Sequence, residues 1–510
     1  MHATNLYLDL SFLPLPTLLG LLCLGYWASC VVYNLYFHPL ASIPGPLWWR
    51  ATRLCFIRSF LSGRLVRDVL KIHERYGEIV RIAPDEVSFA DEDIWQAALS
   101  GRNPLPKNPT FFTPPPGQAN GLLTASSDVG ARIRQVMMPA FTERALSKQE
   151  PVIQLYAGLL VERLKERVAA SSSPNQQAIV NTVDWFNWFT FDLVGELAFG
   201  ESFECLENAK HHPWVDMIFS SIKAAAFAAV TRYYTGLETL LLQIIPTAIR
   251  KRQMEHYTLA VERIHQRMSA PPRDDFMRPM LENNPDFKKM TIPEIEATMS
   301  VLIIAGSETT ATTLCGICNH LVQNPTQLKQ LEQEIRSRFQ SDKQITLHAI
   351  QNLPFLNAVI QEGLRLCNPV AGGLLRRIPK GGLRLCGHFL PEGTHVIVNS
   401  TAMSLSEKNF HRANEFLPER FLPESMRPAE FENDHRNNQK PFSLGVRSCI
   451  GKSFGLAEMR LVLARLVWEF DISMAQDKRL DWNRLKTYVM VQKDTIEIAI
   501  KKRDREHEKS

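Results

Sequence analysis

A loop near the carboxyl end of the chain has the residues that a metal-bound thiolate needs. Residues 442–451 read Phe-Ser-Leu-Gly-Val-Arg-Ser-Cys-Ile-Gly, and an apolar run at helical spacing follows them. Gly445 allows a tight turn, and Gly451 allows backbone to approach where a side chain would clash. Cys449 is therefore expected just before a helix N-terminus, where free N–H groups and the helix dipole lower a thiol pKa. Arg447 adds positive charge beside the cysteine, which suits a ligand that carries carboxylates.

An acid and an alcohol stand next to each other in the middle of the chain. Residues 291–294, Thr-Ile-Pro-Glu, have the spacing of a capping box and predict the start of a long helix. That helix runs past Glu308 and Thr309, and the Thr309 hydroxyl can bond to its own preceding turn and open a local distortion. The small residues Ala305 and Gly306 leave space for a diatomic ligand and water. The alternative is a surface glutamate beside a back-bonded threonine.

Two further pairs need more than their spacing to be interpreted. Glu362 and Arg365 share one face of a helix predicted to start near Leu353, and such a pair is usually a solvent-facing ion pair. Cys315 and Cys318 have C-x-x-C spacing, but without a βαβ context they are expected to pack as small hydrophobic residues.

Together these segments resemble the cytochrome P-450 family. The resemblance implies that Cys449 is the axial ligand of a haem iron and that Glu308 and Thr309 manage water and protons while O2 is split. It also implies a mainly α fold with a minor β portion, and a buried ion-pair network of Glu362, Arg365 and Arg420 that supports the haem loop. This chain has Glu308 where many members of the family have aspartate.

The resemblance also suggests which residues hold the haem (iron protoporphyrin IX). Within the loop they are Phe442, Arg447 and Gly451, and outside it Arg376 follows an apolar turn where the family often places another propionate contact. Either Arg132 or Arg134 supplies a third cation, and we prefer Arg134. Many relatives have an aromatic residue or histidine four positions before this arginine, whereas this chain has glycine, which removes one usual haem contact.

Composition excludes several other classes of protein. The 510 residues carry a net charge of +5 and contain no long basic run, which argues against nucleic-acid binding. The nine cysteines lack disulfide-framework spacing, which fits a reducing compartment. The resemblance implies that electrons come from NADPH through a separate NADPH–cytochrome P450 reductase, and no G-x-G-x-x-G, P-loop or fused flavin segment is recognisable in this chain.

The amino-terminal segment predicts a membrane anchor. Residues 17–37 are apolar and long enough to cross a bilayer core of about 30 Å as a helix. A cleaved signal peptide is the alternative, but no basic residue precedes the apolar run and no clear cleavage site follows it. The next charges are all positive, which predicts a cytosolic body on the endoplasmic reticulum membrane: Arg50, Arg53, Arg58, Arg64 and Arg67. The expected organisation is a lumenal segment 1–16, an anchor 17–37, a proline hinge 38–46 and a catalytic domain 47–510.

The expected activity is insertion of one oxygen atom from O2 into an apolar small molecule by hydroxylation, epoxidation or desaturation. The resemblance is strongest to fungal microsomal members, particularly trichothecene hydroxylase-like oxidases, which suggests a terpenoid or polyketide substrate of secondary metabolism. The alternatives are a haem-thiolate isomerase or dehydratase that uses no external electrons, and a non-enzymatic haem sensor. The candidate pocket walls are Phe111, Phe112, Ile304, Ala305, Val370 and Met490.

Overall fold

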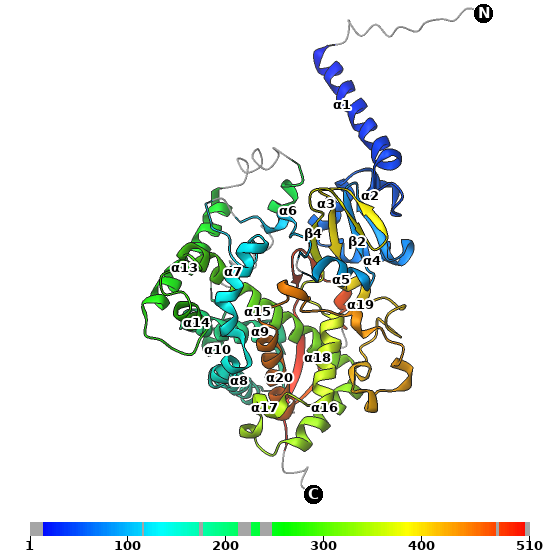
Figure 1. The fold of residues 1–510 in the computed structure, drawn as a ribbon. Helices are drawn as coiled ribbons and strands as arrows, with labels where there is room; N and C mark the ends of the chain where they lie inside the picture. The colour runs from blue at the N-terminus through cyan, green and yellow to red at the C-terminus, as the bar shows by residue number, and fades with distance from the viewer. Residues whose placement is uncertain are drawn as a thin grey trace, which may run out of the picture.

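In the computed structural model of the chain, a mainly helical body carries a smaller β-rich part beside the amino-terminal helix (Figure 1). The structure describes residues 14–101, 103–114, 117–172, 177–212, 226–234, 247–475 and 479–504. The predicted lumenal segment 1–16 therefore lies almost wholly outside the described residues. The predicted fold class is confirmed.

The helical body is built around α15 (Ile292–Gln323). Thr291 and Glu294 form the predicted capping box, in which the Glu294 carboxylate accepts from the Thr291 backbone N–H at 2.9 Å. Helix α15 packs along α9 (Thr182–Phe199) and also contacts α18 (Pro354–Leu366) and α20 (Lys452–Glu469). These four helices bury most of their apolar side chains in one core, which fixes the centre of the molecule.

The remaining helices surround this core or lie on the β-rich side. On the β-rich side and beside the anchor are α2 (Leu47–Ala51), α3 (Leu54–Leu61), α4 (Leu65–Tyr76), α5 (Asp93–Leu99), α6 (Pro109–Phe112) and α19 (Ser400–Ser404). The others are α7 (Ser127–Met137), α8 (Glu143–Ala169), α10 (Cys205–Asn208), α13 (Thr247–Ser269), α14 (Met277–Glu282), α16 (Pro325–Arg338) and α17 (Leu347–Ile350).

Four small sheets complete the described fold. The largest has the strand order β1-β2-β7-β4, in which β2 runs parallel to β7 and the other pairs are antiparallel. A second sheet has the order β3-β11-β8, and two hairpins pair β5 with β6 and β9 with β10. The strands are β1 (Ile79–Ala83), β2 (Glu86–Phe89), β3 (Gln177–Asn181), β4 (Leu374–Arg377), β5 (Leu383–Leu385), β6 (His388–Leu390), β7 (His395–Val398), β8 (Phe470–Met474), β9 (Lys486–Thr487), β10 (Val491–Gln492) and β11 (Glu497–Lys502).

The minor β portion that the resemblance implies includes β1 and β2 on either side of the turn at Pro84, and β5 and β7 later in the chain. The strand β3 was not predicted, because it lies inside a stretch of helical pattern. Its partner β11 is more than 300 residues further along the chain and pairs Ile498 with Val180. A strand stabilised by so distant a partner leaves little local signal.

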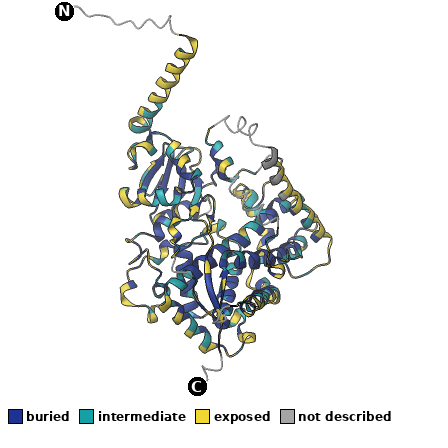
Figure 2. Ribbon diagram, turned by 180° about the vertical axis from the view of Figure 1, so that it is seen from behind, coloured by how far each residue is buried: buried dark blue, intermediate teal, exposed yellow. Residues whose placement is uncertain are grey.

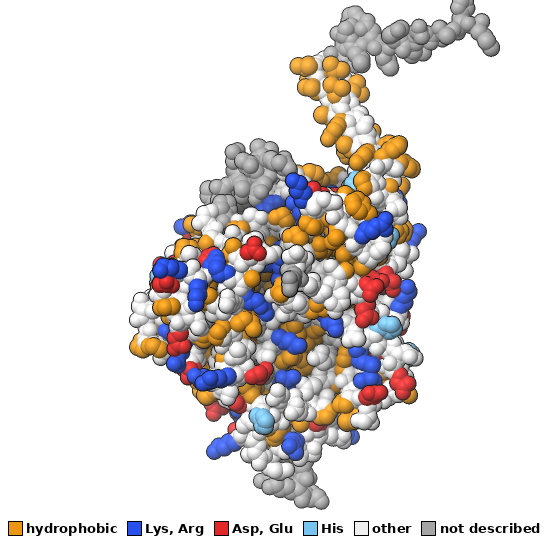
Figure 3. Space-filling view, viewed as in Figure 1, with side chains coloured by type: hydrophobic (Ala, Val, Ile, Leu, Met, Phe, Trp, Pro, Cys, Tyr) orange, Lys and Arg blue, Asp and Glu red, His pale blue; other side chains and the backbone are white. Residues whose placement is uncertain are grey.

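The predicted anchor is a helix that projects from the body, α1 (Leu15–Val32) continued by a π-helical turn at Tyr33–Phe37. None of its residues is buried (Figure 2), and orange apolar side chains cover it in the space-filling view (Figure 3). By length and composition α1 with this turn could span a membrane, and so could α15, but the α15 window is two-thirds buried in the core.

The predicted proline hinge is packed against the body. Leu40 and Ile43 are buried in the core beneath the largest sheet. A Cβ at Gly45 would lie 2.2 Å from the carbonyl oxygen of Arg81, so only glycine allows this approach. The segment that leaves the anchor is therefore stiff and fixed to β1.

Candidate active site

The loop that carries Cys449 lies directly before α20, as the sequence predicts. The Cys449 backbone N–H donates to the carbonyl of Phe442 at 2.8 Å, and this bond closes the loop on itself. Gly445 has φ of +75°, and a Cβ there would lie 2.3 Å from the carbonyl oxygen of Leu99. The tight turn expected at Gly445 is confirmed. Gly451 caps α20, but a Cβ there would meet no described protein atom within 4 Å. The protein itself therefore does not require glycine at position 451.

The expected net lowering of the Cys449 pKa is wrong. The side chain is accessible, yet the protein around the sulfur desolvates a thiolate and raises the thiol pKa. The Gly451 N–H and the charges of Arg134 and Lys452 act in the opposite direction but do not outweigh it. A bound metal cation is the kind of partner that would favour the thiolate here.

Besides Lys452, four cations of the described part of the chain lie around this loop. Arg134 donates to the carbonyl of Ser448 at 2.7 Å, and Arg447 donates to the carbonyl of Leu105 and the Ser127 hydroxyl. Arg376 on β4 is buried, and its Nε has no hydrogen-bond partner among the described residues. The Lys107 ammonium donates to three carbonyl oxygens, those of Leu122 at 2.9 Å, Leu123 at 2.8 Å and Ala125 at 3.2 Å.

Burial and repulsion between these cations lower the pKa values of two of them. Burial and repulsion from Arg447 and Arg376 lower the pKa of Lys107 to about 8. Burial and repulsion from Arg447 lower the pKa of Arg376 to about 10. Among the described residues no carboxylate pairs with Lys107, Arg134, Arg376 or Arg447. Such a cluster is electrostatically incomplete and suits a ligand that brings its own carboxylates.

The structure separates Arg132 from Arg134. Arg132 forms an ion pair with Glu294 at 2.6 Å, at the start of α15. Arg134, two residues later, reaches the Cys449 loop instead. This placement supports the preference for Arg134 as the cation near the cysteine. Lys107 was missed by the sequence analysis, because its only local signal is its place in a proline-rich loop.

Glu308 and Thr309 lie on different faces of α15. The Thr309 hydroxyl donates to the carbonyl of Ala305 at 2.6 Å, as predicted. Ala305 and Thr309 both lie on the accessible side of the helix. The chain is α-helical without interruption from Ile292 to Gln323. Glu308 is buried, which excludes the alternative of a surface glutamate.

The partner of Glu308 comes from the far end of the chain. Lys493, between β10 and β11, donates to Glu308 Oε1, and both side chains are 3% exposed. Thr312, one turn along α15, donates to the same oxygen at 3.2 Å and accepts from Lys493 at 2.9 Å. Burial raises the pKa of Glu308, and Lys493 opposes this shift. Sequence reasoning missed Lys493, which lies 185 residues from its partner.

Helix α15 contacts the helix that follows the cysteine loop through a buried polar contact. Thr310 donates to Glu458 on α20 at 3.1 Å. Burial raises the pKa of Glu458 well above its ordinary value. Thr309 is therefore held close to the helix that begins at the Cys449 loop.

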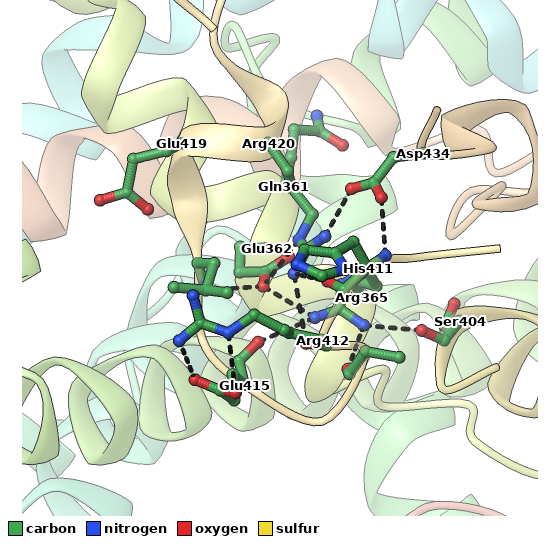
Figure 4. Close-up of polar contacts among 12 residues, drawn as sticks. Gln361, Glu362, Arg365, Ser404, His411, Arg412, Glu415, Glu419, Arg420 and Asp434 are labelled. Carbon is green, nitrogen blue, oxygen red and sulfur yellow. Dashed lines mark hydrogen bonds and ion pairs between the residues drawn. The ribbon is translucent and has the colours of Figure 1, made fainter. Parts of the chain in front are cut away.

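Behind the site, Glu362, Arg365 and Arg420 form the predicted buried network (Figure 4). Arg365 binds Glu362 through two hydrogen bonds of 2.7 Å, and Arg420 contacts Glu362 at 3.3 Å. Asp434 adds a second carboxylate that pairs with Arg420. All four side chains are at most 1% exposed, so the solvent-facing alternative is excluded.

The two cysteines of α15 pack as expected. Cys315 and Cys318 are free and buried within this helix, and burial raises the pKa of Cys315 to about 12, which fits small hydrophobic residues.

Among the candidate pocket walls, Phe111 packs edge-on against Phe60 and Tyr233 in an aromatic cluster. Phe111 is therefore a core residue at least in part, while Ala305 and Val370 are exposed and stay candidates.

Comparison with known proteins agrees with this geometry along nearly the whole chain. The family model described as Cytochrome P450 matches residues 43–500. The chain belongs to the cytochrome P450 family. It is 35% identical to cytochrome P450 monooxygenase atr2 of Stereocaulon alpinum over 95% of this chain and 94% of that protein. It is 36% identical to versicolorin B desaturase stcL of Emericella nidulans, over 97% of this chain and all of that protein.

The chain is thus a cytochrome P450 monooxygenase, an oxidoreductase that works with haem-thiolate iron and electrons from a redox partner. The residues present fit a haem. The four cations without carboxylates match the two propionates of a haem.

Proposed function

We propose that Cys449 is the axial iron ligand and that Arg134, Arg376 and Arg447 bind the haem propionates, with Phe442 and Gly451 lining the same group. The observation that carries this assignment is the cluster of four cations without acidic partners around one accessible cysteine. Lys107, which the sequence analysis did not select, joins this set. When bound, the haem supplies O2 activation and oxygen insertion, as it does throughout this family.

The chain's own residues supply the cysteine loop, the proton path and an apolar surface. Thr309 presents its hydroxyl on the accessible side of α15, and while its hydrogen is donated to Ala305 its oxygen can accept a hydrogen bond from a water there. Glu308 carries protons to this position from the interior. In the overall reaction an apolar substrate R–H, O2, NADPH and a proton give R–OH, water and NADP+.

The substrate proposed is an apolar terpenoid or polyketide intermediate of fungal secondary metabolism. Its support is the apolar lining expected at Ala305, Val370 and Met490 and the names of the relatives, one of which is a desaturase of versicolorin B. The proposed source of electrons is NADPH through a separate cytochrome P450 reductase.

We further propose that residues 17–37 anchor the protein in the endoplasmic reticulum membrane, with residues 47–510 as a cytosolic catalytic domain. The exposed apolar helix and the arginines that follow it support this orientation. Added protease should degrade the body in sealed microsomes. A body protected from protease until detergent is added would contradict the topology.

The decisive test of the site is a spectrum. Reduced protein with CO should show the strongly red-shifted Soret band of thiolate ligation, and Cys449→Ala should abolish this band. Cys55→Ala is the matched control, because Cys55 is a partly buried free cysteine of α3. Loss of the band in the Cys55 variant but not in the Cys449 variant would reject the assignment.

A further inference from the structure

The ion pair between Glu308 and Lys493 leaves one carboxylate oxygen without a partner, as the buried pair of Glu86 with Arg53 also does. Both Lys493 and Thr312 donate to Glu308 Oε1, whereas Glu308 Oε2 is buried with no hydrogen-bond partner among the described residues. In the network behind the site, by contrast, both oxygens of Glu362 accept hydrogen bonds. A buried oxygen without a partner is costly, so an oxygen that is kept in this state needs a reason.

The lysine itself is held firmly by its surroundings. Its ammonium also lies 3.5 Å from the side-chain oxygen of Asn187, a buried residue of α9. Three residues further along, the backbone N–H of Ile496 donates to the Asn181 side chain at 3.1 Å, and the Ile496 carbonyl accepts from the Thr182 N–H at 2.8 Å. The loop between β10 and β11 is thereby fixed to the start of α9, and Lys493 reaches α15 from a rigid support.

The length of the acid matters for this contact. Glutamate has one more methylene group than aspartate, and in this chain the Glu308 carboxylate extends to Lys493 on the side of α15 away from the accessible Thr309. The other ionisable side chain of α15 close enough to interact with Glu308 is Cys315, one turn beyond Thr312. Lys493 is therefore the principal charge that governs Glu308.

We propose that Lys493 is a positioning residue for proton delivery, which holds Glu308 by one oxygen and leaves the other free to exchange a proton with the path to Thr309. This inference rests on the proposed function. Lysine suits the role because a single rotatable ammonium can bind one oxygen, whereas an arginine fork tends to occupy both. Lys493 favours the charged form of this carboxylate without closing off its second oxygen.

The test needs no knowledge of the substrate. Reductase-driven consumption of O2 without substrate gives hydrogen peroxide, with one NADPH oxidised per O2, or water, with two NADPH oxidised per O2. Water requires further protons at the bound oxygen, so the NADPH-to-O2 ratio measures proton delivery. Thr309→Ala serves as the reference for impaired delivery and should shift the ratio toward one.

Lys493→Met, which keeps the length of the side chain and removes its charge, should also shift the ratio toward one. It should move the acid limb of the pH profile of this ratio to higher pH, because an unpaired buried carboxyl stays protonated to higher pH. Lys493→Arg should retain most of the wild-type ratio. Lys165→Met is the matched control, since Lys165 pairs with a different buried glutamate, Glu469 of α20, and should leave the profile unchanged.

A purely structural ion pair predicts a different pattern. If Lys493 acts through Glu308, adding Lys493→Met to Glu308→Gln should change neither the ratio nor its pH profile further, since coupled residues are not additive. The double variant also leaves no unpaired buried charge, so it tests the inference even if Lys493→Met alone fails to fold. Additive losses, or a wild-type profile in Lys493→Met, would overturn the inference. A wild-type protein without the thiolate CO band would instead reject the proposed function itself.

Discussion

Two groups of buried charges lie within the same protein, and they are built in opposite ways. The network behind the site has two carboxylates, Glu362 and Asp434, for two guanidinium groups, those of Arg365 and Arg420. Arg365 also donates to the carbonyl groups of Ser404 and Ala413 at 2.6 Å each. Every partner that this network needs is supplied by the chain, so it can form as soon as the chain folds.

The cluster around Cys449 is the reverse. In the described part of the chain, Lys107, Arg134, Arg376 and Arg447 lie near one another without a carboxylate. Burial lowers the pKa of each of them, and repulsion from Arg447 adds to this shift in Lys107 and Arg376. A folded protein tolerates such a cluster at a cost in stability. The difference teaches that charge balance separates a structural network from a binding site, even when both contain the same residue types.

The largest effect is expected from breaking the balanced network. Arg365→Ala leaves the Glu362 carboxylate buried with half of its partners, and removal of one member of a buried ion pair typically costs about 3–5 kcal/mol. We expect the variant to accumulate poorly and to lose its CO spectrum at a much lower temperature than the wild type.

The matched control for this variant lies beside the network in Figure 4. Arg412 pairs with Glu415, but these side chains are 43% and 53% exposed. Arg412→Ala should therefore unfold close to the wild-type temperature. Equal thermal stability of the two variants would show that the balanced network is not needed for the fold.

A variant in the cluster around Cys449 should behave differently with and without haem. Arg376→Met removes a buried, repelled charge, so the haem-free protein should be as stable as the wild type or more stable. The haem-bound protein should lose haem faster to an acceptor such as apomyoglobin, because one propionate partner is gone.

Arg377→Met is the control for this experiment, since neighbouring residues of a strand point to opposite faces and Arg377 on β4 is exposed. It should leave haem transfer unchanged. If Arg376→Met destabilises the haem-free protein as Arg365→Ala does, the cluster is a second structural network and not a binding site.

The parts of these two groups that are specified by short local patterns could be predicted from the sequence. The Cys449 loop, the Glu362–Arg365 pair and the capping box at Thr291 are local patterns, and all three have the predicted positions. In each case the residue types at a few neighbouring positions determine the local backbone conformation.

What the sequence did not predict is distant along the chain. Lys107 joins Arg376 and Arg447 from a proline-rich loop, and Lys493 is 185 residues from Glu308 along the chain. Neither lysine has a neighbour in sequence that suggests its partner. The direction of the Cys449 pKa was predicted wrongly for a similar reason, since desolvation depends on everything that packs around the sulfur.

The smallest and most specific effect should come from Lys107. In the folded protein its pKa is about 8, below the ordinary value of 10.5. Below about pH 8 the amine is protonated in both states, and the folded state carries the cost of the buried charge. Between these two values the unfolded chain binds more protons than the folded one, so the free energy of unfolding should rise with pH.

The rise of the free energy of unfolding with pH tests whether Lys107 belongs to the cluster around Cys449. The urea midpoint of the haem-free wild type, measured between about pH 7 and about pH 9.5, should increase more than that of Lys107→Met. Lys288→Met, which changes a lysine that is 83% exposed, should follow the wild type. In the haem-bound protein the difference between wild type and Lys107→Met should shrink or reverse, because propionates near Lys107 favour its charged form and return its pKa toward the ordinary value. A pH-dependent difference that is the same with and without haem would mean that no carboxylate of the haem lies near Lys107, and the cation set would then consist of the three arginines.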